Sequence, residues 1–315
     1  MIENIVNWYE QFGRKELPWR LTSNPYHIYL SEIMLQQTQV KTVLERFYFQ
    51  FLETFPTLED LAQASQEEVL KAWEGLGYYT RARNLHKTAQ LVQTQLPSSS
   101  KALLELPGIG PSTANAIACF AFGEAVPILD GNMKRILYRY FKKEVANEKE
   151  LWTMVEKLFS KKEAYIFNQA MMDIGSTLCT PRNPKCEQCP LSKKCKGKAT
   201  PLLYPKKKAK KVTPIRNKMM VIYKKNNQYG LYKSSEKLLG GLWGFKQYEK
   251  KEEESLILGH IEHIYSHFKL KAIVVLKEED EPKVHWFSLK EIEKLPLSKA
   301  DQKALELLKQ YNSNT

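Results

Sequence analysis

Hydrophobic residues recur at spacings of three and four along the first two thirds of the chain. This spacing sets apolar side chains on one face of a helix. Short turns that carry Pro or Gly interrupt it, and the segments that follow it best are 28–35, 69–76, 84–92, 113–122, 133–141 and 151–159. We therefore expect residues 1–198 to fold as an all-helical domain.

The pattern changes near Lys218. Short runs of β-branched and aromatic residues follow, between clusters of Asn, Gly and acidic residues, and a helical pattern returns over 299–310. Runs of this kind predict strands. The segment 199–217 holds three prolines and a cluster of lysines, which is typical of a linker. The pattern thus predicts a helical domain, a basic linker and a smaller α+β domain over 218–315.

Composition narrows the kind of partner. The 315 residues include 48 Lys and Arg against 35 Asp and Glu, a formal net charge of +13. Eleven of the basic residues lie between Lys193 and Lys218, where no acidic residue occurs. This local excess suits contact with a polyanion, although a solvated linker would carry it equally well. Since no apolar run is long enough for a membrane span and the N-terminus lacks the layout of a signal peptide, we expect a cytoplasmic protein.

Four of the five cysteines lie within seventeen residues, with the spacing C-x6-C-x2-C-x5-C; they are Cys179, Cys186, Cys189 and Cys195. In a cytoplasmic chain such thiols favour a metal over disulfides. Zinc sites usually use two close pairs of cysteines, whereas one close pair occurs here. The spacing therefore favours an iron–sulfur cluster with a structural role and leaves zinc as the alternative. Cys119, which lies alone in an apolar helical stretch, is expected to be a small buried residue.

The segment 103–115, LLELPGIGPSTAN, predicts a helix, a tight turn and a second helix. Gly108 and Gly110 allow a positive φ and the close approach of another backbone. Pro111 suits the first position of the second helix. The free N–H groups at the start of that helix would bind a phosphate. The segment therefore predicts a contact with the DNA backbone, with an ordinary helical corner as the alternative.

Two acidic residues stand out by their surroundings. Glu32 lies in the uncharged helical stretch 29–40, where desolvation would raise its pKa and keep it protonated as a general acid. Asp130 follows an apolar run and precedes the predicted helix 132–141, so its simplest role is an N-cap. A surface position for Glu32 and plain capping by Asp130 are the alternatives to catalysis.

Taken together, these motifs resemble the endonuclease III superfamily of base-excision DNA glycosylases, and within it the MutY-type adenine glycosylases. The resemblance covers almost the whole chain, with several separate motifs in the same order. They are LPWR at 17–20, SEIMLQQTQV at 31–40, GLGYYTRARNLH at 75–86, LPGIGPSTANAI at 106–117, ILDGNMKR at 128–135 and the cysteine loop at 179–195. The resemblance implies a helix-hairpin-helix, a [4Fe–4S] cluster on the four cysteines and a monomer that acts on double-stranded DNA. It also implies two helical subdomains, one over about 21–125 and one over about 1–20 with 126–198.

Three features favour an adenine glycosylase within this superfamily. Ser112 occupies the position where endonuclease III-like enzymes carry the Lys that forms a Schiff base with the sugar. Glu32 lies in the motif SE-x-MLQQT, where those enzymes lack the acid. The region 218–315, with LLGGLWGF at 238–245, resembles a Nudix domain that recognises 8-oxoguanine opposite the adenine.

The region 218–315 differs from Nudix hydrolases in one respect. The sequence after Phe245, KQYEKKEEES, lacks the R-E-x-x-E-E cluster that a Nudix hydrolase needs. We therefore expect a domain that reads DNA and does not hydrolyse nucleotides. The stretch between Phe245 and His260 is also short, which leaves the second layer of this domain open.

The resemblance further implies the roles of individual residues. Glu32 would protonate the adenine ring, Asp130 would stabilise the positive charge of the sugar, and Asn132 would orient that carboxylate or the sugar phosphate. Other residues are implied to contact substrate or DNA: Arg20 and Leu35, Gln37 and Tyr78 as wedges in the duplex, Gly108, Gly110 and Ser112 at the hairpin, and His263, Tyr265 and Ser266 at 8-oxoguanine.

The resemblance thus implies the removal of adenine paired with 8-oxoguanine or guanine, without strand cleavage. Two other functions remain open. A bifunctional pyrimidine glycosylase–lyase is disfavoured by Ser112. A catalytically silent DNA-binding iron–sulfur protein is disfavoured by Glu32 and Asp130.

Overall fold

A computed structural model describes residues 1–206, 212–236, 238–249 and 256–314 of the chain. Contacts between Cα atoms group the chain into two compact units. One unit comprises residues 1–40 and 91–209, and the other comprises 41–90 and 210–315. Helical segments therefore occur in both units, and the strands of the described residues all lie in the second. The domain boundaries expected from the sequence remain a prediction.

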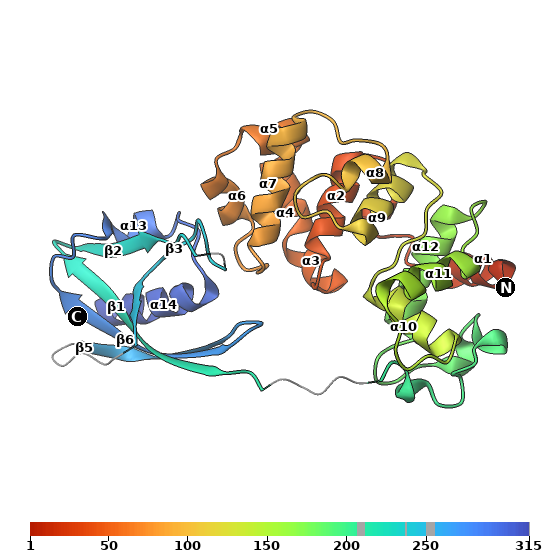
Figure 1. Cartoon of the computed structure of the whole chain (residues 1–315). Helices are drawn as coiled ribbons and strands as arrows, with labels where there is room; N and C mark the ends of the chain where they lie inside the picture. Colours follow the sequence, from red (N-terminus) through yellow and green to blue (C-terminus); the bar gives the residue numbers. More distant parts are fainter. Residues whose placement is uncertain (207–211, 237, 250–255, 315) are drawn as a thin grey trace. The chain divides into compact units, whose positions relative to one another are not determined.

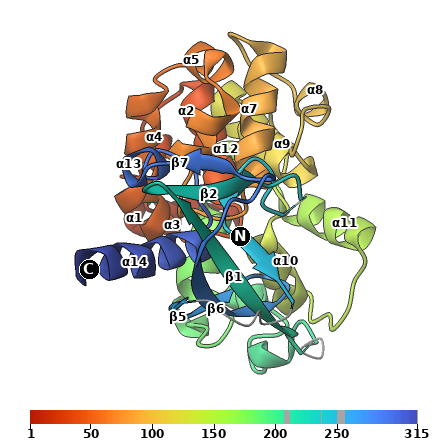
Figure 2. The same ribbon diagram turned by 90° about the vertical axis from the view of Figure 1, so that its left-hand side faces the viewer.

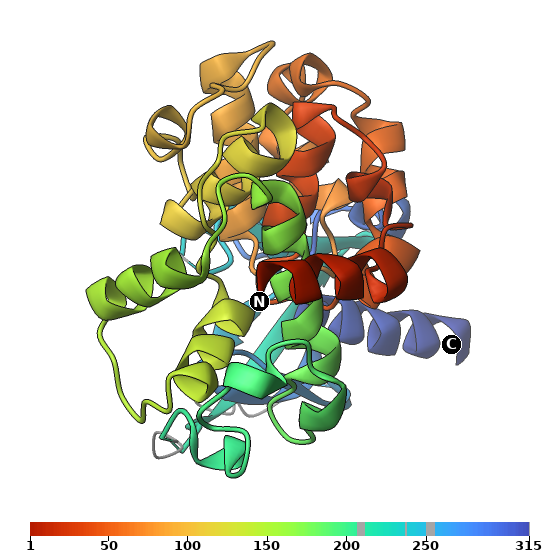
Figure 3. The ribbon, with the colours of Figure 1, turned by 90° about the vertical axis from the view of Figure 1, so that its right-hand side faces the viewer.

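The first unit is helical, as the hydrophobic spacing predicts. Its helices are α1 (Ile2–Phe12), α2 (Pro25–Met34), α8 (Ser100–Leu103), α9 (Pro111–Phe122), α10 (Gly131–Tyr140), α11 (Glu148–Leu158) and α12 (Ala164–Asp173). α1 packs on α12, and α2 packs on α9; Figure 3 shows the red N-terminal helix beside the green α12. Among the described residues, no helix is long and apolar enough to cross a membrane.

The helical hairpin forms where the glycine- and proline-bearing segment predicts it. α8 begins after Ser99, whose hydroxyl accepts a hydrogen bond from the Ala102 backbone N–H. Gly108 has φ +75°, in the region that favours glycine. Gly110, by contrast, is extended at φ −90° and caps α9, whose first residue is Pro111. Of these two glycines, Gly108 adopts the positive φ that glycine permits and Gly110 does not.

The cysteine-rich segment after α12 is built from single turns. A π-helical turn (Ile174–Leu178) leads into it, and short 3-10 turns follow at Cys186–Gln188, Ser192–Lys194 and Pro201–Leu203. Such short turns bury few side chains of their own. The segment therefore depends on contacts with α10 and on its cysteines for its shape.

The second unit begins with five further helices: α3 (Val40–Arg46), α4 (Tyr48–Thr54), α5 (Leu58–Gln63), α6 (Gln66–Ala72) and α7 (Thr80–Val92). Capping boxes start two of them, at Thr57 for α5 and at Ser65 for α6. Trp73, which follows α6, is fully buried and meets the Phe51 ring of α4 edge-on, with ring centroids 5.8 Å apart. These contacts fix the turn between α6 and α7.

The rest of the second unit is a mixed sheet with seven strands among the described residues, in the order β3-β2-β1-β6-β5, with β4 paired to β1 and β7 paired to β2 (Figure 1). The strands are β1 (Ile215–Lys225), β2 (Gln228–Lys233), β3 (Trp243–Gly244), β4 (Lys246–Tyr248), β5 (Leu256–Ile264), β6 (Lys269–Glu278) and β7 (His285–Phe287). β1 and β6 run side by side and parallel along their length (Figure 2). β5 and β6 pair as an antiparallel hairpin. The strand runs predicted after Lys218 are thus confirmed.

The main core of this domain lies between the sheet and α14 (Lys299–Asn314), with α13 (Leu289–Ile292) at its edge. Fully buried Met220, Ile222, Leu231 and Val274 belong to this core, and Ala304 and Leu308 of α14 pack against them. Alternate residues of β1, including Val221 and Tyr223, enter a smaller cluster on the other side of the sheet. The short stretch between Phe245 and His260, which left the second layer of this domain open, includes residues 250–255, and these lie outside the described part of the chain.

Candidate active site

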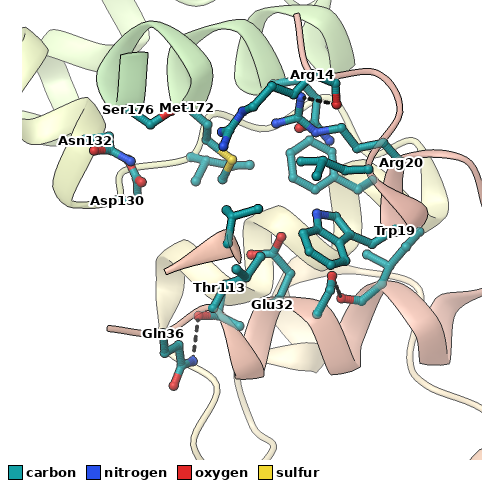
Figure 4. Close-up of a pocket in the computed structure, with 18 of the residues that line it drawn as sticks. Arg14, Trp19, Arg20, Glu32, Gln36, Thr113, Asp130, Asn132, Met172 and Ser176 are labelled. Atoms are coloured by element: carbon teal, nitrogen blue, oxygen red, sulfur yellow. Dashed lines mark hydrogen bonds between the residues drawn. The ribbon is translucent and has the colours of Figure 1, made fainter. Parts of the chain in front are cut away.

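A polar cavity of about 250 Å³ lies in the first unit between α2, α9, α10 and α12. Its walls combine apolar side chains with the acidic and amide groups that the sequence singles out. Figure 4 shows the Glu32 side chain extending from α2 beside Trp19, with Asp130 and Asn132 at another side of the cavity. The predicted residues that line it are Arg20, Glu32, Leu35, Ser112, Asp130 and Asn132.

Glu32 has the environment of a proton donor. It sits on α2, a helix with no acid in its first turn, no basic residue in its last, and mostly buried apolar side chains. Burial raises the pKa of Glu32 to about 7, and the negative charge of Asp130 adds to this shift, while the charge of Arg20 opposes it. At neutral pH the Glu32 carboxyl group is therefore protonated in a large share of the molecules.

Asp130 caps α10, as its position in the sequence predicts. Its Oδ1 accepts a hydrogen bond of 2.7 Å from the Met133 backbone N–H. Burial nevertheless raises the pKa of Asp130, although hydrogen bonds from Met133 and Asn132 and the charge of Arg135 oppose the shift. Asp130 is thus less solvated than a simple surface cap, while its hydrogen bonds still favour the ionised form.

Asn132 is held by a cation from its own helix. Arg135 donates a hydrogen bond of 2.8 Å from Nη2 to Asn132 Oδ1. The same guanidinium donates from Nε to the Cys179 carbonyl, at 2.7 Å, and from Nη2 to the Gly175 carbonyl. Arg135 therefore ties the amide that faces the cavity to the start of the cysteine loop.

Arg20 belongs to a buried ion cluster on the cavity wall. Its Nη1 and Nη2 bind the two carboxylate oxygens of Asp173 at 2.7 and 2.9 Å. Arg14 binds the same carboxylate through its backbone N–H and its guanidinium. Burial would raise the pKa of Asp173, but the hydrogen bonds and charges of the two arginines outweigh it and lower the pKa. Among the described residues, Arg20 Nε has no hydrogen-bond partner.

The remaining predicted DNA contacts of the first unit lie outside the cavity lining. Gln37 is exposed in the turn after α2, where its φ is +57°. Gly108 and Gly110 are exposed in the hairpin. A methyl group added to Gly110 would meet no atom within 4 Å, so another molecule can approach its backbone closely.

In the second unit, the residues predicted to contact DNA occupy two turns. Tyr78 precedes α7 with φ +50° and is 45% exposed. Ser266 lies at the tip of the β5–β6 hairpin and is exposed. Tyr265 packs against the domain core, and its ring meets those of His263 and Phe268, with centroids 4.5 and 4.7 Å away. Tyr265 thus anchors this turn, and Ser266 is presented outward.

The four predicted metal ligands gather around one small pocket with Arg139. Arg139 Nη1 lies 3.3 Å from Cys179 Sγ and also binds the Cys179 and Thr180 carbonyl oxygens. Burial raises the pKa of the Cys189 thiol to about 12, so its ionisation needs a compensating positive charge. Among the described residues, no three His, Cys, Asp or Glu side chains are close enough to hold a single metal ion.

Several residues of the cavity were missed by the sequence analysis. Trp19 lies inside the quoted LPWR motif, and Gln169 and Met172 come from α12. Asp173 offered the same signal as Glu32, because it is an acid within the apolar run 170–175. The pairing of Asp173 with Arg14 and Arg20 joins positions more than 150 residues apart, and no local pattern predicts it.

Comparison with known proteins supports the arrangement. Residues 30–161 match the HhH-GPD superfamily of base excision DNA repair proteins. Residues 179–195 match the iron–sulfur binding domain of endonuclease III, and residues 218–307 match the NUDIX domain. The all-helical region with an iron–sulfur loop and the Nudix-like α+β domain are therefore confirmed.

Full-length relatives share both parts of the chain. The adenine DNA glycosylase of Buchnera aphidicola subsp. Baizongia pistaciae (strain Bp) is 39% identical over 88% of this chain and 80% of its own length. The adenine DNA glycosylase of Buchnera aphidicola subsp. Schizaphis graminum (strain Sg) is 36% identical over 97% of each chain.

Among solved structures, a thermostable thymine-DNA glycosylase is 33% identical, with a TM-score of 0.58 over 63% of this chain and 94% of that one. Since that protein is named for another base, the shared fold alone does not identify the base that is removed. The full-length relatives identify it as adenine, and this chain belongs to the adenine DNA glycosylase family, enzymes of DNA base excision repair that hydrolyse N-glycosyl bonds and carry a [4Fe–4S] cluster.

Proposed function

We propose that this enzyme removes adenine paired with 8-oxoguanine or guanine in duplex DNA, as a monomer and without cutting the strand. The observation that carries the proposal is Glu32, whose pKa is raised to about 7 in a cavity that it shares with Asp130 and Asn132. The target adenine leaves the base stack and enters this cavity.

In the proposed reaction Glu32 is the general acid. Its carboxyl proton passes to a ring nitrogen of adenine, so that the electrons of the broken glycosidic bond leave with a neutral base. Arg20, whose guanidinium Asp173 holds in the cavity wall, contacts the base in this proposal. Trp19 and Leu35 supply apolar surface beside it.

Asp130 and Asn132 act on the sugar. As the glycosidic bond breaks, positive charge develops on the sugar ring, and the Asp130 carboxylate stabilises it or bonds to it briefly. Asn132, oriented by Arg135, holds this carboxylate or the neighbouring phosphate in place. A water molecule then adds to the sugar carbon and passes its proton to the Glu32 carboxylate, which completes the hydrolysis and restores the acid.

Ser112 supports hydrolysis without strand cleavage. It lines the cavity at the first turn of α9, where a lysine amine could reach the sugar. A serine hydroxyl cannot form the Schiff base that a lyase needs. Borohydride should therefore trap no covalent complex with a DNA containing a damaged pyrimidine. Strong trapping would favour the glycosylase–lyase alternative.

DNA contacts surround this chemistry in the proposal. The exposed start of α9, with Gly108 and Gly110 before it, binds a backbone phosphate. Gln37 and Tyr78 wedge into the duplex next to the lesion. Ser266 contacts 8-oxoguanine from the tip of the β5–β6 hairpin, and His263 and Tyr265 support it.

The decisive experiment is a single-turnover assay on duplex DNA with adenine opposite 8-oxoguanine. Glu32→Gln keeps the shape of the side chain but removes its proton, and we expect adenine release to slow by at least about a hundredfold. Glu53→Gln, an exposed position on α4, is the matched control and should keep the wild-type rate. Equal rates for the wild type and Glu32→Gln would refute the role of Glu32.

A further inference from the structure

Within the second unit, α6 and the C-terminal domain meet through a shared carboxylate. Glu67 Oε2 accepts a hydrogen bond of 2.9 Å from Trp243 Nε1 and an ion pair of 2.8 Å from Lys233 Nζ. The Glu67 side chain is 35% exposed and that of Lys233 is 47% exposed, so salt screens the pair only in part. The hydrogen bond from the Trp243 indole also fixes the orientation of the Glu67 carboxylate, which an ion pair alone does not.

A second group of contacts joins the end of α6 to the segment 293–297. Glu74 Oε1 accepts a hydrogen bond of 2.8 Å from the Leu297 backbone N–H. Lys71 Nζ bridges the Glu74 carboxylate to the carbonyl oxygens of Glu293 and Leu295. Tyr79 donates from its hydroxyl to the Leu297 carbonyl at 3.3 Å. Leu297 thus has both backbone groups bound to the α6–α7 turn.

The glycine pair of the LLGGLWGF motif forms a third contact. Gly241 has φ +85°, and a Cβ added to it would lie 2.8 Å from Leu70 Cδ1 and 3.0 Å from Gln66 Oε1. The carbonyl of Gly240 accepts a hydrogen bond of 2.7 Å from Arg83 Nη1. This motif therefore fits its backbone against α6 and α7, a use that Nudix hydrolysis does not require.

The same turn carries Tyr78. Trp73 Nε1 donates to the Gly77 carbonyl at 3.1 Å, and the Arg81 guanidinium lies 5.4 Å from the centroids of both the Trp73 and Tyr78 rings. Tyr79, the neighbour of Tyr78, is buried and reaches Leu297. Tyr78 is thus exposed on a turn that the contacts of Trp73, Arg81 and Tyr79 hold in place.

The segment that follows Leu297 also contacts the β5–β6 hairpin. Ser298 follows Leu297, and its hydroxyl donates to the buried Asp301 carboxylate at 2.5 Å. The other Asp301 oxygen accepts from the Phe245 backbone N–H, and Ser298 also bonds the Tyr265 hydroxyl. The segment 297–301 therefore touches the α6–α7 turn on one side and the anchor of Ser266 on the other.

We propose that Glu67, Glu74 and Tyr79 are positioning residues, which dock the C-terminal domain on the α6–α7 turn so that Tyr78 and Ser266 reach the mispair from one preorganised body. The inference rests on the proposed recognition of 8-oxoguanine. Two turns fixed to each other meet the DNA without first losing independent motion, so more of the contact energy appears as affinity for the correct pair.

The docking can be tested without DNA, by hydrogen exchange of the Leu297 amide in the full chain. Glu74→Ala removes the acceptor of this N–H, so we expect its exchange to accelerate at least about tenfold. The Ile273 amide in the central strand β6 serves as the internal reference, and Glu53→Ala serves as the control variant. Unchanged exchange at Leu297 would refute the docking, whatever the enzyme recognises.

The effect on recognition is tested by reversing the charge pair. Glu67→Lys and Lys233→Glu should each lower the preference for 8-oxoguanine over guanine by about tenfold, through weaker binding of the 8-oxoguanine duplex and not through the rate of the bound complex. The double exchange should restore part of it, since the ion pair is rebuilt while Trp243 loses its acceptor. No rescue would refute the positioning role. A wild type without any preference would instead refute the proposed function.

Discussion

Glu32 and Asp130 line one cavity, and the charge of Asp130 adds to burial in raising the pKa of Glu32 to about 7. The charge of Asp130 thereby affects the protonation of Glu32. The more Asp130 is ionised, the more Glu32 keeps its proton. One group can then donate a proton to the base while the other stabilises charge on the sugar.

This relationship predicts how activity depends on pH. Glu32 must be protonated to act as an acid, and its fraction of protonated side chains falls as pH rises through about 7. We expect the single-turnover rate of adenine release to fall about tenfold for each pH unit well above that value. A rate that rises steadily from pH 6 to 9 would contradict the assignment.

The origin of the shift can be measured apart from the chemistry. Asp130→Asn removes the charge that contributes to the raised pKa, so carboxyl titration of Glu32 by NMR should move to lower pH in the variant. The remaining shift, caused by burial, should persist. An identical titration in both proteins would show that the two groups are not coupled.

A third prediction concerns the cysteine loop. Cys186→Ser should lose iron and loosen the segment 179–195, because its turns are too short to hold their shape unaided. The loop carries Arg182, Lys185, Lys193, Lys194 and Lys196. Its loss should therefore weaken binding to DNA and make the logarithm of the affinity less steep against the logarithm of the salt concentration.

Cys119 supplies the matched control for this experiment. It is buried in α9 and accepts a hydrogen bond of 3.3 Å from Asn168 Nδ2. Cys119→Ser should keep its iron content and its salt dependence. Loss of iron from Cys119→Ser together with retention in Cys186→Ser would contradict the assignment of the ligands.

Local sequence patterns predicted the helices of the first unit and the burial of one of its acids. The spacing of apolar residues located α2, α9, α10 and α11, and the uncharged stretch around Glu32 identified a desolvated acid. These features depend on neighbours within one or two turns of helix, which the sequence displays directly.

Contacts between residues that lie far apart in the sequence were not predicted. The parallel pairing of β1 with β6 joins residues more than 50 positions apart, such as Ile215 and Lys269, and no local pattern displays it. The resemblance assigned Arg20 to substrate contact but could not reveal that Asp173 already binds two of its nitrogens. The docking of α6 on the C-terminal domain joins residues more than 150 positions apart and has no local signature.

The Asp173 cluster predicts a large effect on stability. The Asp173 side chain is fully buried, and that of Arg20 is 4% exposed. Asp173→Asn would leave the Arg20 charge buried without its partner, which should lower the free energy of unfolding by about 3–5 kcal/mol at pH 7. Urea denaturation measures this loss. Glu10→Gln removes an exposed ion pair with Lys15 and should cost at most about 1 kcal/mol.

The pH dependence of this loss has a definite sign. The folded-state pKa of Asp173 is lowered, so its stabilisation is present above the unfolded-state pKa of about 3.9 and disappears as pH falls through the folded value. The wild type and Asp173→Asn should therefore differ at neutral pH and converge in acid. A constant difference down to pH 2 would show that the ion pairs are not its cause.

The last prediction separates reading of the opposite base from removal of adenine. Ser266 is exposed at the tip of the β5–β6 hairpin, while the neighbouring Tyr265 is anchored in the domain core. Ser266→Ala removes one hydroxyl and leaves that anchor intact. If the hydroxyl bonds 8-oxoguanine, affinity for the adenine–8-oxoguanine duplex should fall by about three- to tenfold, because a single hydrogen bond contributes about 0.5–1.5 kcal/mol. Affinity for the adenine–guanine duplex should stay the same.

Ser313→Ala, at the exposed end of α14, is the control for this change. It should alter neither affinity. Equal losses on both duplexes for Ser266→Ala would mean that Ser266 contacts DNA without distinguishing the base. No loss on either would remove Ser266 from the interface and leave the reading of 8-oxoguanine to other residues of the domain, such as His263. Only a loss confined to the 8-oxoguanine duplex agrees with the role proposed for the hairpin tip.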